Sequence, residues 1–287
     1  MTFTSVSLYT WLIRSNESFM LTLFRTPVSE TEQVELLLTS PCFISDLHLD
    51  TSSQDDLKAF AHFLSNIAHR YEELVILGDF FDYWVGDDAV ETAQDFISLI
   101  KEFSQQHKVY FMHGNRDFML GQRFANACHA HLISDPTIAT IQKRKYLLSH
   151  GDLWCTKDID YQKVRARVRN PWWQWLILRL PLSKRLEIAR NARNKSKTQK
   201  NNKSPDVMDV VAESILASCP VDLDGVIHGH THRPGSYPID GKLSRWVIPD
   251  WRHSDQGQID AGFIAFDNNA PTINSLKISL SEDICVR

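Results

Sequence analysis

Five short β-rich runs, each ending in a polar cluster, recur along this chain of 287 residues. Between several of them lie segments whose apolar residues are spaced as on one face of a helix. Strand, polar turn and helix in this order indicate an α/β fold whose ligand lies at the carboxyl ends of the strands. The runs are CFISDLHLD, ELVILGDFFD, KVYFMHGNRD, KYLLSHGD and GVIHGHTH. We therefore expect five strand ends to converge on one site, and the later runs RWVIPD, GFIAFD and TINSLKISL to make the sheet mixed.

The second run continues as ILGDFFDYWVGDD, so four aspartates follow an apolar segment that reads as a buried strand. A buried carboxylate costs several kcal/mol unless a partner neutralises it. This stretch therefore predicts a cation close to these carboxylates.

The polar strand ends supply a set of nitrogen and oxygen ligands. Asp46 and His48 are two residues apart, as are His230 and His232, and on an extended segment such pairs point to one side. The candidate metal ligands are Asp46, His48, Asp79, Asn115, His150, His230 and His232. This set suits Mn, Fe, Zn or Mg. Seven ligands exceed one open site, so two ions that share a carboxylate explain them better.

Each of these residues taken alone has an ordinary explanation. A single aspartate after a strand is usually a turn or helix cap, and Asn115 beside a glycine is usually a turn residue. A single histidine such as His150 is usually a core or surface residue with its hydrogen bonds satisfied. All five clusters in this order are unlikely to arise by chance, so the combination favours a metal site.

Charge is unevenly distributed along the chain, which has 31 basic and 35 acidic residues overall. The segment Lys157–Lys203 holds 14 of the basic residues and only 3 of the acidic ones. Its aromatic and apolar residues suit acyl chains, and its Lys and Arg suit anionic headgroups or phosphates. A solvated helical hairpin is the plain alternative. Nucleic-acid binding is not expected, because the tryptophans cluster apart from the charges.

The cysteines and the N-terminal region give information on the cellular location of the protein. The five cysteines are scattered and form no Cys-x-x-Cys pair, which is typical of a reducing compartment. No apolar run reaches the roughly 18 residues of a spanning helix. We interpret residues 1–40 as an N-terminal extension of unknown role and not as a signal peptide.

The blocks SDLHL, GDFFD, GNRD, SHGD and GHTH resemble those of the calcineurin-like metallophosphoesterase superfamily. The resemblance implies a four-layer αββα sandwich with a dinuclear metal site. Residues 41–287 would form this domain, with residues 157–205 as an inserted basic and aromatic helical cap. By resemblance, Asp46, His48, Asp79 and His232 would hold one ion. The other would be held by Asp79, Asn115, His150 and His230, with Asp79 as the bridge. Asp82, Asp87 and Asp88 are then better explained as supporting or turn residues.

Position 116 departs from the superfamily pattern, which usually has histidine after Gly-Asn. Arginine stays charged and cannot serve as a general acid at neutral pH. It suits a leaving group that needs no proton, such as a phosphate with a second pKa near ~6, and it can bind a phosphate oxygen through its fork. Arg116 therefore favours pyrophosphate cleavage over protein dephosphorylation.

The longer blocks HGNRDFMLGQRF and HGDLWCTKDIDYQ are similar to those of the diphosphatases of lipid A biosynthesis in Gram-negative bacteria. That family cleaves UDP-2,3-diacylglucosamine to UMP and 2,3-diacylglucosamine 1-phosphate, usually with Mn²⁺, at the cytoplasmic face of the inner membrane. We expect no obligate protein partner for this chain. Arg116 and His230 would stabilise the transition state. By motif, substrate contacts fall on Asn115, Arg116, Asp158, Ser196, Lys200, Lys203 and His230, with Lys200 where the family often has asparagine.

Two other functions remain open from the sequence. A broader phosphodiesterase or nucleotide pyrophosphatase would use the same site without needing an acyl-binding cap. A scaffold that uses this fold only for protein contacts is less favoured, because such scaffolds typically lose ligands and all seven are present here.

Overall fold

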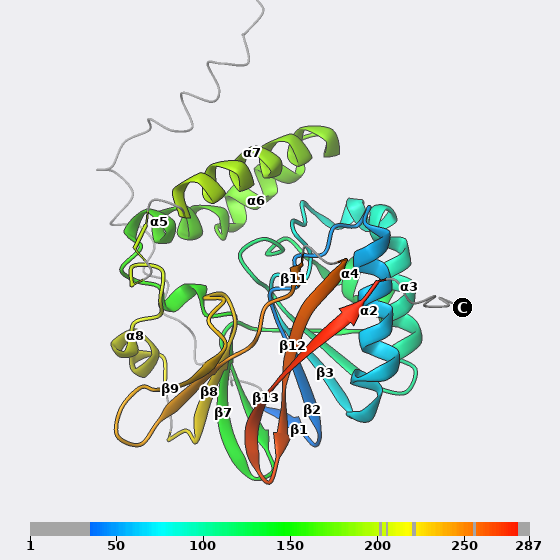
Figure 1. Cartoon of the computed structure of the whole chain (residues 1–287). Helices are drawn as coiled ribbons and strands as arrows, with labels where there is room; N and C mark the ends of the chain where they lie inside the picture. Colours follow the sequence, from blue (N-terminus) through cyan, green and yellow to red (C-terminus); the bar gives the residue numbers. More distant parts are fainter. Residues whose placement is uncertain (1–34, 201–202, 205, 220–221, 255–256, 281–287) are drawn as a thin grey trace, which may run out of the picture. The chain divides into compact units, whose positions relative to one another are not determined.

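In the computed structural model the described residues are 35–200, 203–204, 206–219, 222–254 and 257–280. They form two β-sheets with helices outside them (Figure 1). The first sheet has the order β11-β12-β2-β3-β4-β5, with β13 paired to β12. Its strands are β2 (Pro41–Ile44), β3 (Glu73–Leu77), β4 (Lys108–Met112), β5 (His131–Ile133), β11 (Arg252–His253), β12 (Gln258–Asp267) and β13 (Ala270–Ser279).

The second sheet has the order β1-β6-β7-β8-β10-β9. Its strands are β1 (Leu36–Leu38), β6 (Thr137–Ile141), β7 (Arg144–Ser149), β8 (Gly225–His228), β9 (Gly235–Pro238) and β10 (Ser244–Val247). Both sheets contain parallel and antiparallel pairs, so the prediction of mixed pairing is confirmed. The five runs with polar ends are divided between the sheets: β2, β3 and β4 lie in one, and β7 and β8 in the other.

Three hydrophobic clusters separate four layers. One joins the first sheet to the helices α2 (Gln54–Asn66), α3 (Gln94–Phe103) and α4 (Gln122–Cys128). A second lies between the two sheets. A third joins the outer face of the second sheet to η3 (Asp152–Trp154) and α8 (Ala212–Ala217). The predicted four-layer αββα sandwich is therefore confirmed.

Period-two alternation explains why the central strands are buried on both faces. In β3, Leu74 and Ile76 pack on the helices, whereas Val75 and Leu77 pack on the other sheet. Side chains of a strand point alternately to its two faces, and here both faces are covered. The run Leu74–Leu77 therefore reads as continuously apolar, and the next polar side chain after it is that of Asp79.

Helix α2 shows how local sequence sets an element next to the site. Ser53 caps it by accepting a hydrogen bond from the Asp56 amide at 3.1 Å. Its apolar stripe includes Phe60, which is fully buried and lies edge-on to Phe80 with ring centroids 5.0 Å apart. Phe80 follows Asp79 directly, so packing of α2 supports the loop that carries this carboxylate.

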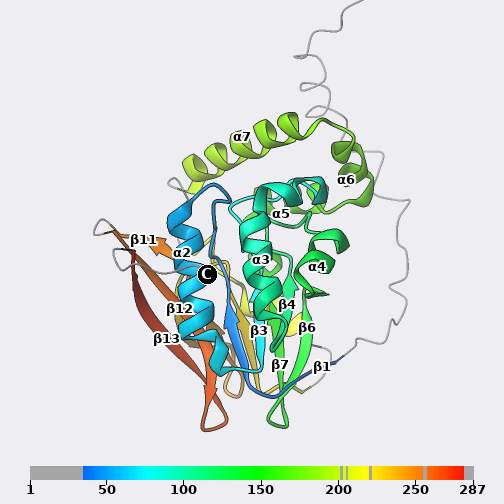
Figure 2. The same ribbon diagram turned by 90° about the vertical axis from the view of Figure 1, so that its right-hand side faces the viewer.

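The inserted cap comprises α5 (Ile159–Val168), α6 (Pro171–Leu178) and α7 (Leu182–Lys200), which lie together beyond one end of the sheets (Figure 2). Asn170 caps α6, and Pro171 occupies its first turn. Two ion pairs tie α7 to the loop after β3, namely Arg185 with Asp88 and Arg193 with Asp82. Within the part of the chain that the structure describes, no helix is long and apolar enough to cross a membrane.

The predicted boundary at residue 40 falls just after a strand. Leu36–Leu38 form β1, which pairs in parallel with β6. The sheet therefore begins inside the segment predicted as an extension, because these three residues supply an edge strand. Residues 1–34 lie outside the described residues, so the structure does not bear on the role of that segment. The remaining short elements are η1 (Ala68–Arg70) and η2 (Asp87–Ala93).

Replacing Phe60 by alanine tests the support that α2 gives to this loop. We expect Phe60→Ala to lower the free energy of unfolding by about 3–5 kcal/mol, because it leaves a cavity between Phe80 and Phe96. Urea denaturation followed by tryptophan fluorescence measures it. The exposed Gln54→Ala on the same helix is the control, expected within about 0.5 kcal/mol of wild type.

Candidate metal centre

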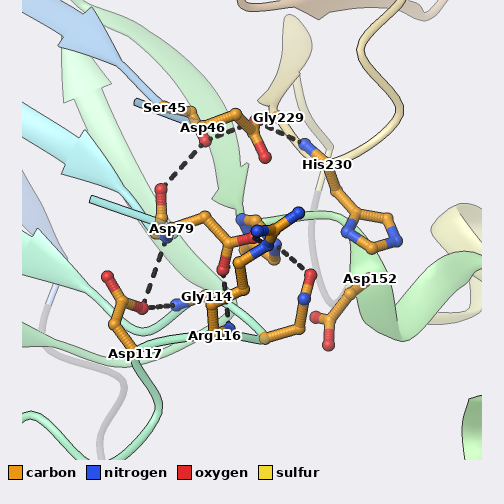
Figure 3. A network of polar contacts seen from close by, with 12 residues as sticks. Ser45, Asp46, Asp79, Gly114, Arg116, Asp117, Asp152, Gly229 and His230 are labelled. Carbon is orange, nitrogen blue, oxygen red and sulfur yellow. Dashed lines mark hydrogen bonds and ion pairs between the residues drawn. The ribbon is translucent and has the colours of Figure 1, made fainter. Parts of the chain in front are cut away.

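Five strand ends from two sheets bring the predicted ligands to one place. Asp46 follows β2, Asp79 follows β3, and Asn115 follows β4 in the first sheet, whereas His150 follows β7 and His230 follows β8 in the second. Asp46, Asp79 and His150 are each at most 1% exposed. Polar contacts that link these loops, including those of Ser45, Asp46, Asp79 and Asp117, are drawn in Figure 3.

Left-handed backbone conformation sets the direction of five of the seven predicted ligands. Asp46, His48, Asp79, His230 and His232 have φ between 52° and 67°. The prediction that each pair lies on an extended segment is therefore wrong, although both pairs still contribute to the centre. Such φ values cost roughly 1–3 kcal/mol each for residues with a Cβ and cluster at functional sites. The fold maintains them because the loops are packed against one another.

Two glycines allow that packing. A Cβ at Gly114 would overlap the carboxylate of Asp79, and a Cβ at Gly229 would overlap Ser45 and the carboxylate of Asp46. The glycines of GNRD and GHTH are thus required because backbone from one loop approaches a side chain from another.

One ligand group comprises Asp46, His48 and His232, whose ligand atoms lie within 4.8 Å of one another. The Nε2 atoms of His232 and His48 lie 3.6 and 4.0 Å from Asp46 Oδ1. His232 Nδ1 donates to Asp250 Oδ2 at 2.7 Å, so Nε2 of the neutral ring keeps its lone pair facing Asp46. A carboxylate that orients a histidine in this way is typical of metal sites.

The other group comprises Asp46, Asp79 and His150. His150 Nδ1 donates to the Leu77 carbonyl at 2.9 Å, and its Nε2 lies 3.7 Å from Asp79 Oδ1. The other oxygen of Asp79 lies 3.8 Å from His48 Nδ1. The two oxygens of Asp79 thus face different groups, as the bridging role implied by resemblance requires. Asp46 is the member that the two groups share.

Asn115 and His230 complete the predicted set. The Asn115 side-chain oxygen lies 3.0 Å from His150 Nε2. The ring of His230 packs edge-on to that of His150 with centroids 5.0 Å apart, and its backbone amide donates to Asp46 Oδ2 at 2.7 Å. All seven predicted ligands therefore lie in one cluster.

The electrostatics of the cluster favour positive charge. Burial raises the pKa of Asp79 to about 6, against the opposing charge of His150. Burial alone lowers the pKa of His150, but the carboxylates of Asp79 and Asp46 outweigh it and raise the pKa to about 9. Divalent cations would neutralise the carboxylates and leave His150 neutral, the form in which it ligates.

The carboxylate of Asp46 shows whether the residues at this position fit a metal ion. Its Oδ2 accepts from Ser45 Oγ and from the His230 amide, whereas its buried Oδ1 has no hydrogen-bond partner among the described residues. An uncompensated buried carboxylate oxygen costs free energy. Because Oδ1 faces imidazole nitrogens, the residues fit a divalent cation at this position.

Arg116 lies beside the carboxylates. Its backbone amide donates to Asp79 Oδ1 at 2.8 Å, and its Nε lies 3.5 Å from Asp79 Oδ2. Its Nη1 donates to Asp82 Oδ1 at 2.5 Å. The guanidinium therefore sits at the edge of the centre, where it can reach a phosphoryl group held there.

Of the other predicted substrate contacts, two lie together, one is exposed on α7, and the side chain of one is not described. Asp158 caps α5, and its two oxygens each accept from Lys203 Nζ at 2.7 Å, so these two residues lie together. Ser196 lies on the exposed part of α7. The side chain of Lys200 is outside the described residues.

A polar cavity of about 320 Å³ lies where α7 faces the loops after β2 and β3. Its lining is Asp50, Ser52, Tyr83, Arg190, Arg193 and Asn194. Two arginines and several hydrogen-bonding groups suit an anionic or hydroxyl-bearing part of a ligand.

Several supporting residues were not predicted. Asp250 orients His232, and Asp117 accepts from the amides of Gly114 and Phe80, both at 2.8 Å. Asp152, fully buried, accepts from the Tyr161 hydroxyl and Arg165 Nε of α5. The available signal was an aspartate in the same polar cluster or strand end, as in GNRD, SHGD and RWVIPD.

The charge of Asp152 depends on its neighbours. Burial by itself raises its pKa, but the charges of His150 and His230 outweigh burial and hold the pKa well below the usual range. The ionised carboxylate can then anchor Tyr161 and Arg165, so α5 is tied to the loop that carries His150.

Comparison with known proteins agrees with this geometry. The calcineurin-like phosphoesterase family model matches residues 42–234. UDP-2,3-diacylglucosamine hydrolase of Histophilus somni (strain 2336) is 41% identical over 216 residues, covering 73% of this chain and 91% of the relative. This chain belongs to the UDP-2,3-diacylglucosamine hydrolase family, within the calcineurin-like phosphoesterases.

Other members of the family are similar to a comparable degree. The Haemophilus influenzae (strain PittGG) hydrolase is 43% identical, over 73% of this chain and 90% of its own. The Bordetella parapertussis hydrolase is 37% identical, over 82% of this chain and 95% of its own. Among solved structures, a dimetal phosphatase from Danio rerio covers 85% of this chain and 99% of its own, at a TM-score of 0.45 and 10% identity.

The cluster predicts how metal content responds to single substitutions. Asp79→Ala should lose both ions, because each oxygen of Asp79 faces a different ligand group. Elemental analysis of the purified protein measures the loss. Asp82→Ala should retain most of the metal, since Asp82 pairs with arginines and contacts neither group. Two tightly bound ions in Asp79→Ala would contradict the bridging role.

Proposed function

We propose that this protein hydrolyses the pyrophosphate bond of UDP-2,3-diacylglucosamine, giving UMP and 2,3-diacylglucosamine 1-phosphate for lipid A biosynthesis. The observation that carries the proposal is the gathering of all seven candidate ligands in one cluster with Arg116 beside it, in a chain about 40% identical to hydrolases named for this substrate. A turnover assay on UDP-2,3-diacylglucosamine, with and without added Mn²⁺, tests it directly.

Two divalent cations, which we propose to be Mn²⁺, would be held by Asp46, His48, Asp79, Asn115, His150, His230 and His232. The nitrogen and oxygen donors suit Mn²⁺ among other hard and borderline ions. When bound, such ions polarise phosphoryl oxygens and lower the pKa of coordinated water. The protein contributes fixed ligand directions, through the left-handed loops and through Asp250 behind His232.

Arg116 and His230 would stabilise the phosphoryl group as negative charge develops on it. Among the described residues, no hydrogen bond reaches Arg116 Nη2, so one arm of the fork is available to a phosphate oxygen. Arg116 stays protonated and cannot supply a proton to the leaving group. A sugar phosphate leaves without one, because its second pKa is near ~6. An alkoxide leaving group would need a proton donor at this position.

The cap would receive the acyl chains and approach the cytoplasmic face of the inner membrane. Trp172 is 76% exposed, and Trp175, Leu176 and Leu178 are also exposed on α6. Arg179 stacks on Trp175 at 3.5 Å from the ring centroid, which leaves its charge beside the apolar surface. Aromatic and aliphatic side chains beside cations suit a lipid surface with anionic headgroups.

Arg116 generates the sharpest test of the leaving-group argument. Arg116→Ala should lower kcat and kcat/KM by roughly 10² or more, as for loss of a fixed oxyanion donor. Arg116→Lys should recover only part of this, since lysine lacks the fork. Arg116→His should improve activity on phosphodiesters with alkoxide leaving groups relative to the pyrophosphate. An unchanged ratio of the two activities would show that position 116 does not select the leaving group.

The cap generates a second test. Trp172→Ser with Leu176→Ser should lower kcat/KM for the diacylated substrate roughly 10-fold or more, since each buried methylene is worth about 0.8 kcal/mol. Activity on bis(p-nitrophenyl) phosphate should change little. Leu216→Ser, at an exposed leucine of α8, is the matched control and should leave both activities near wild type. Equal losses on both substrates would assign α6 to fold stability alone.

A further inference from the structure

Asp82 lies between a residue of the candidate site and the cap. It is only 5% exposed, and each of its carboxylate oxygens pairs with a different arginine. Oδ1 accepts from Arg116 Nη1 at 2.5 Å, and Oδ2 pairs with Nη1 of Arg193 on α7. A buried carboxylate with two arginine partners has its charge compensated and its geometry restricted.

The backbone of Arg116 is also fixed by hydrogen bonds. Its amide donates to Asp79 Oδ1 at 2.8 Å, and its carbonyl accepts from the Trp84 amide at 3.0 Å. These contacts fix the backbone, but the long side chain has several rotatable bonds beyond them. Asp82 is the residue that restrains its far end, because it binds Nη1 while Nε lies 3.5 Å from Asp79.

We propose that Asp82 is the positioning residue for Arg116, holding the guanidinium toward the phosphoryl group, and that Arg193 of the cap completes this arrangement by binding the second oxygen of Asp82. The proposal rests on the hydrolysis described above. It also gives α7 a role besides lipid contact, because docking of the cap supplies one of the two partners of Asp82.

Charge and geometry make opposite predictions for Asp82. A carboxylate beside Arg116 offsets the positive charge that would attract a phosphate. If charge alone mattered, removing Asp82 would strengthen binding of the anionic substrate and raise kcat/KM. If positioning matters, the released guanidinium samples other rotamers and kcat falls, because a displacement of about 1 Å can cost 10²-fold in rate.

The same loop contains a matched control. Asp88 pairs with Arg185 of α7, so it also ties the cap to the loop after β3. Among the described residues it makes no contact with Arg116. Asp88→Ala therefore removes a cap ion pair of the same kind without releasing Arg116.

The experiment is a double-mutant cycle on kcat for UDP-2,3-diacylglucosamine, with metal content and melting temperature recorded for every variant. Asp82→Ala should lower kcat roughly 10- to 100-fold, with KM within about threefold of wild type. In an Arg116→Ala background, the same substitution should lower the rate by less than about threefold, because the group it positions is gone. Because the Arg116→Ala variants react slowly, their rates are measured in single-turnover experiments with enzyme in excess over substrate. Asp88→Ala should stay near the wild-type kcat.

Asp82→Asn is the second variant if Asp82→Ala folds poorly. It keeps the shape and one oxygen that can accept from Arg116, so its loss should be smaller and should again require Arg116. Equal losses in the two backgrounds, an unchanged or raised kcat, or an equal loss in Asp88→Ala would each overturn the positioning role. A wild-type protein that does not turn over the substrate would instead overturn the proposed function itself, before any variant is compared.

Discussion

Two carboxylates, Asp46 and Asp79, are buried where the ends of the two sheets meet, and much of the structure around them serves to compensate that burial. Each accepts a backbone amide from another loop, His230 to Asp46 and Arg116 to Asp79. These hydrogen bonds satisfy one oxygen of each residue. The remaining oxygens, Oδ1 of Asp46 and Oδ2 of Asp79, face imidazole nitrogens and a guanidinium, so the site favours positive charge.

Further aspartates surround the candidate ligands and form polar contacts with the loops that carry them. Asp117 organises the loop after β4 through backbone amides, and Asp250 orients His232. Asp152 connects the loop of His150 to α5 through Tyr161 and Arg165. Because buried polar groups are costly when unpaired, these contacts restrict the directions of the candidate ligands that they support. The left-handed φ values of the ligands persist for the same reason: neighbouring loops and close-packed glycines leave little room for alternatives.

The cap differs from this rigid centre in composition and in packing. Helix α6 has no buried residues and exposes tryptophan and leucine side chains, whereas the strands β2, β3 and β8 are buried throughout. Three ion pairs join the helices α5 and α7 to loops of the two sheets: Arg193 to Asp82, Arg185 to Asp88 and Arg165 to Asp152. Trp173 of α6 also lies near Phe118, with ring centroids 6.5 Å apart. The exposed face of α6 thus remains apolar while the basic helices α5 and α7 are paired with aspartates beside the candidate centre.

The sequence by itself determined the five strands with polar ends and the identity of all seven candidate ligands, because each apolar run ends visibly at a polar cluster. It also pointed to Arg116 as the departure that bears on the leaving group. It did not determine how five similar runs divide between two sheets, since β3 and β8 look alike along the chain and differ only in their partners. Nor did it reveal the left-handed backbone at Asp46 and His48, the arginine partners of Asp82, or the contact of Asp250 with His232. These depend on contacts between residues far apart in the chain, such as Asp82 with Arg193, and only the tertiary structure brings such groups within hydrogen-bonding distance.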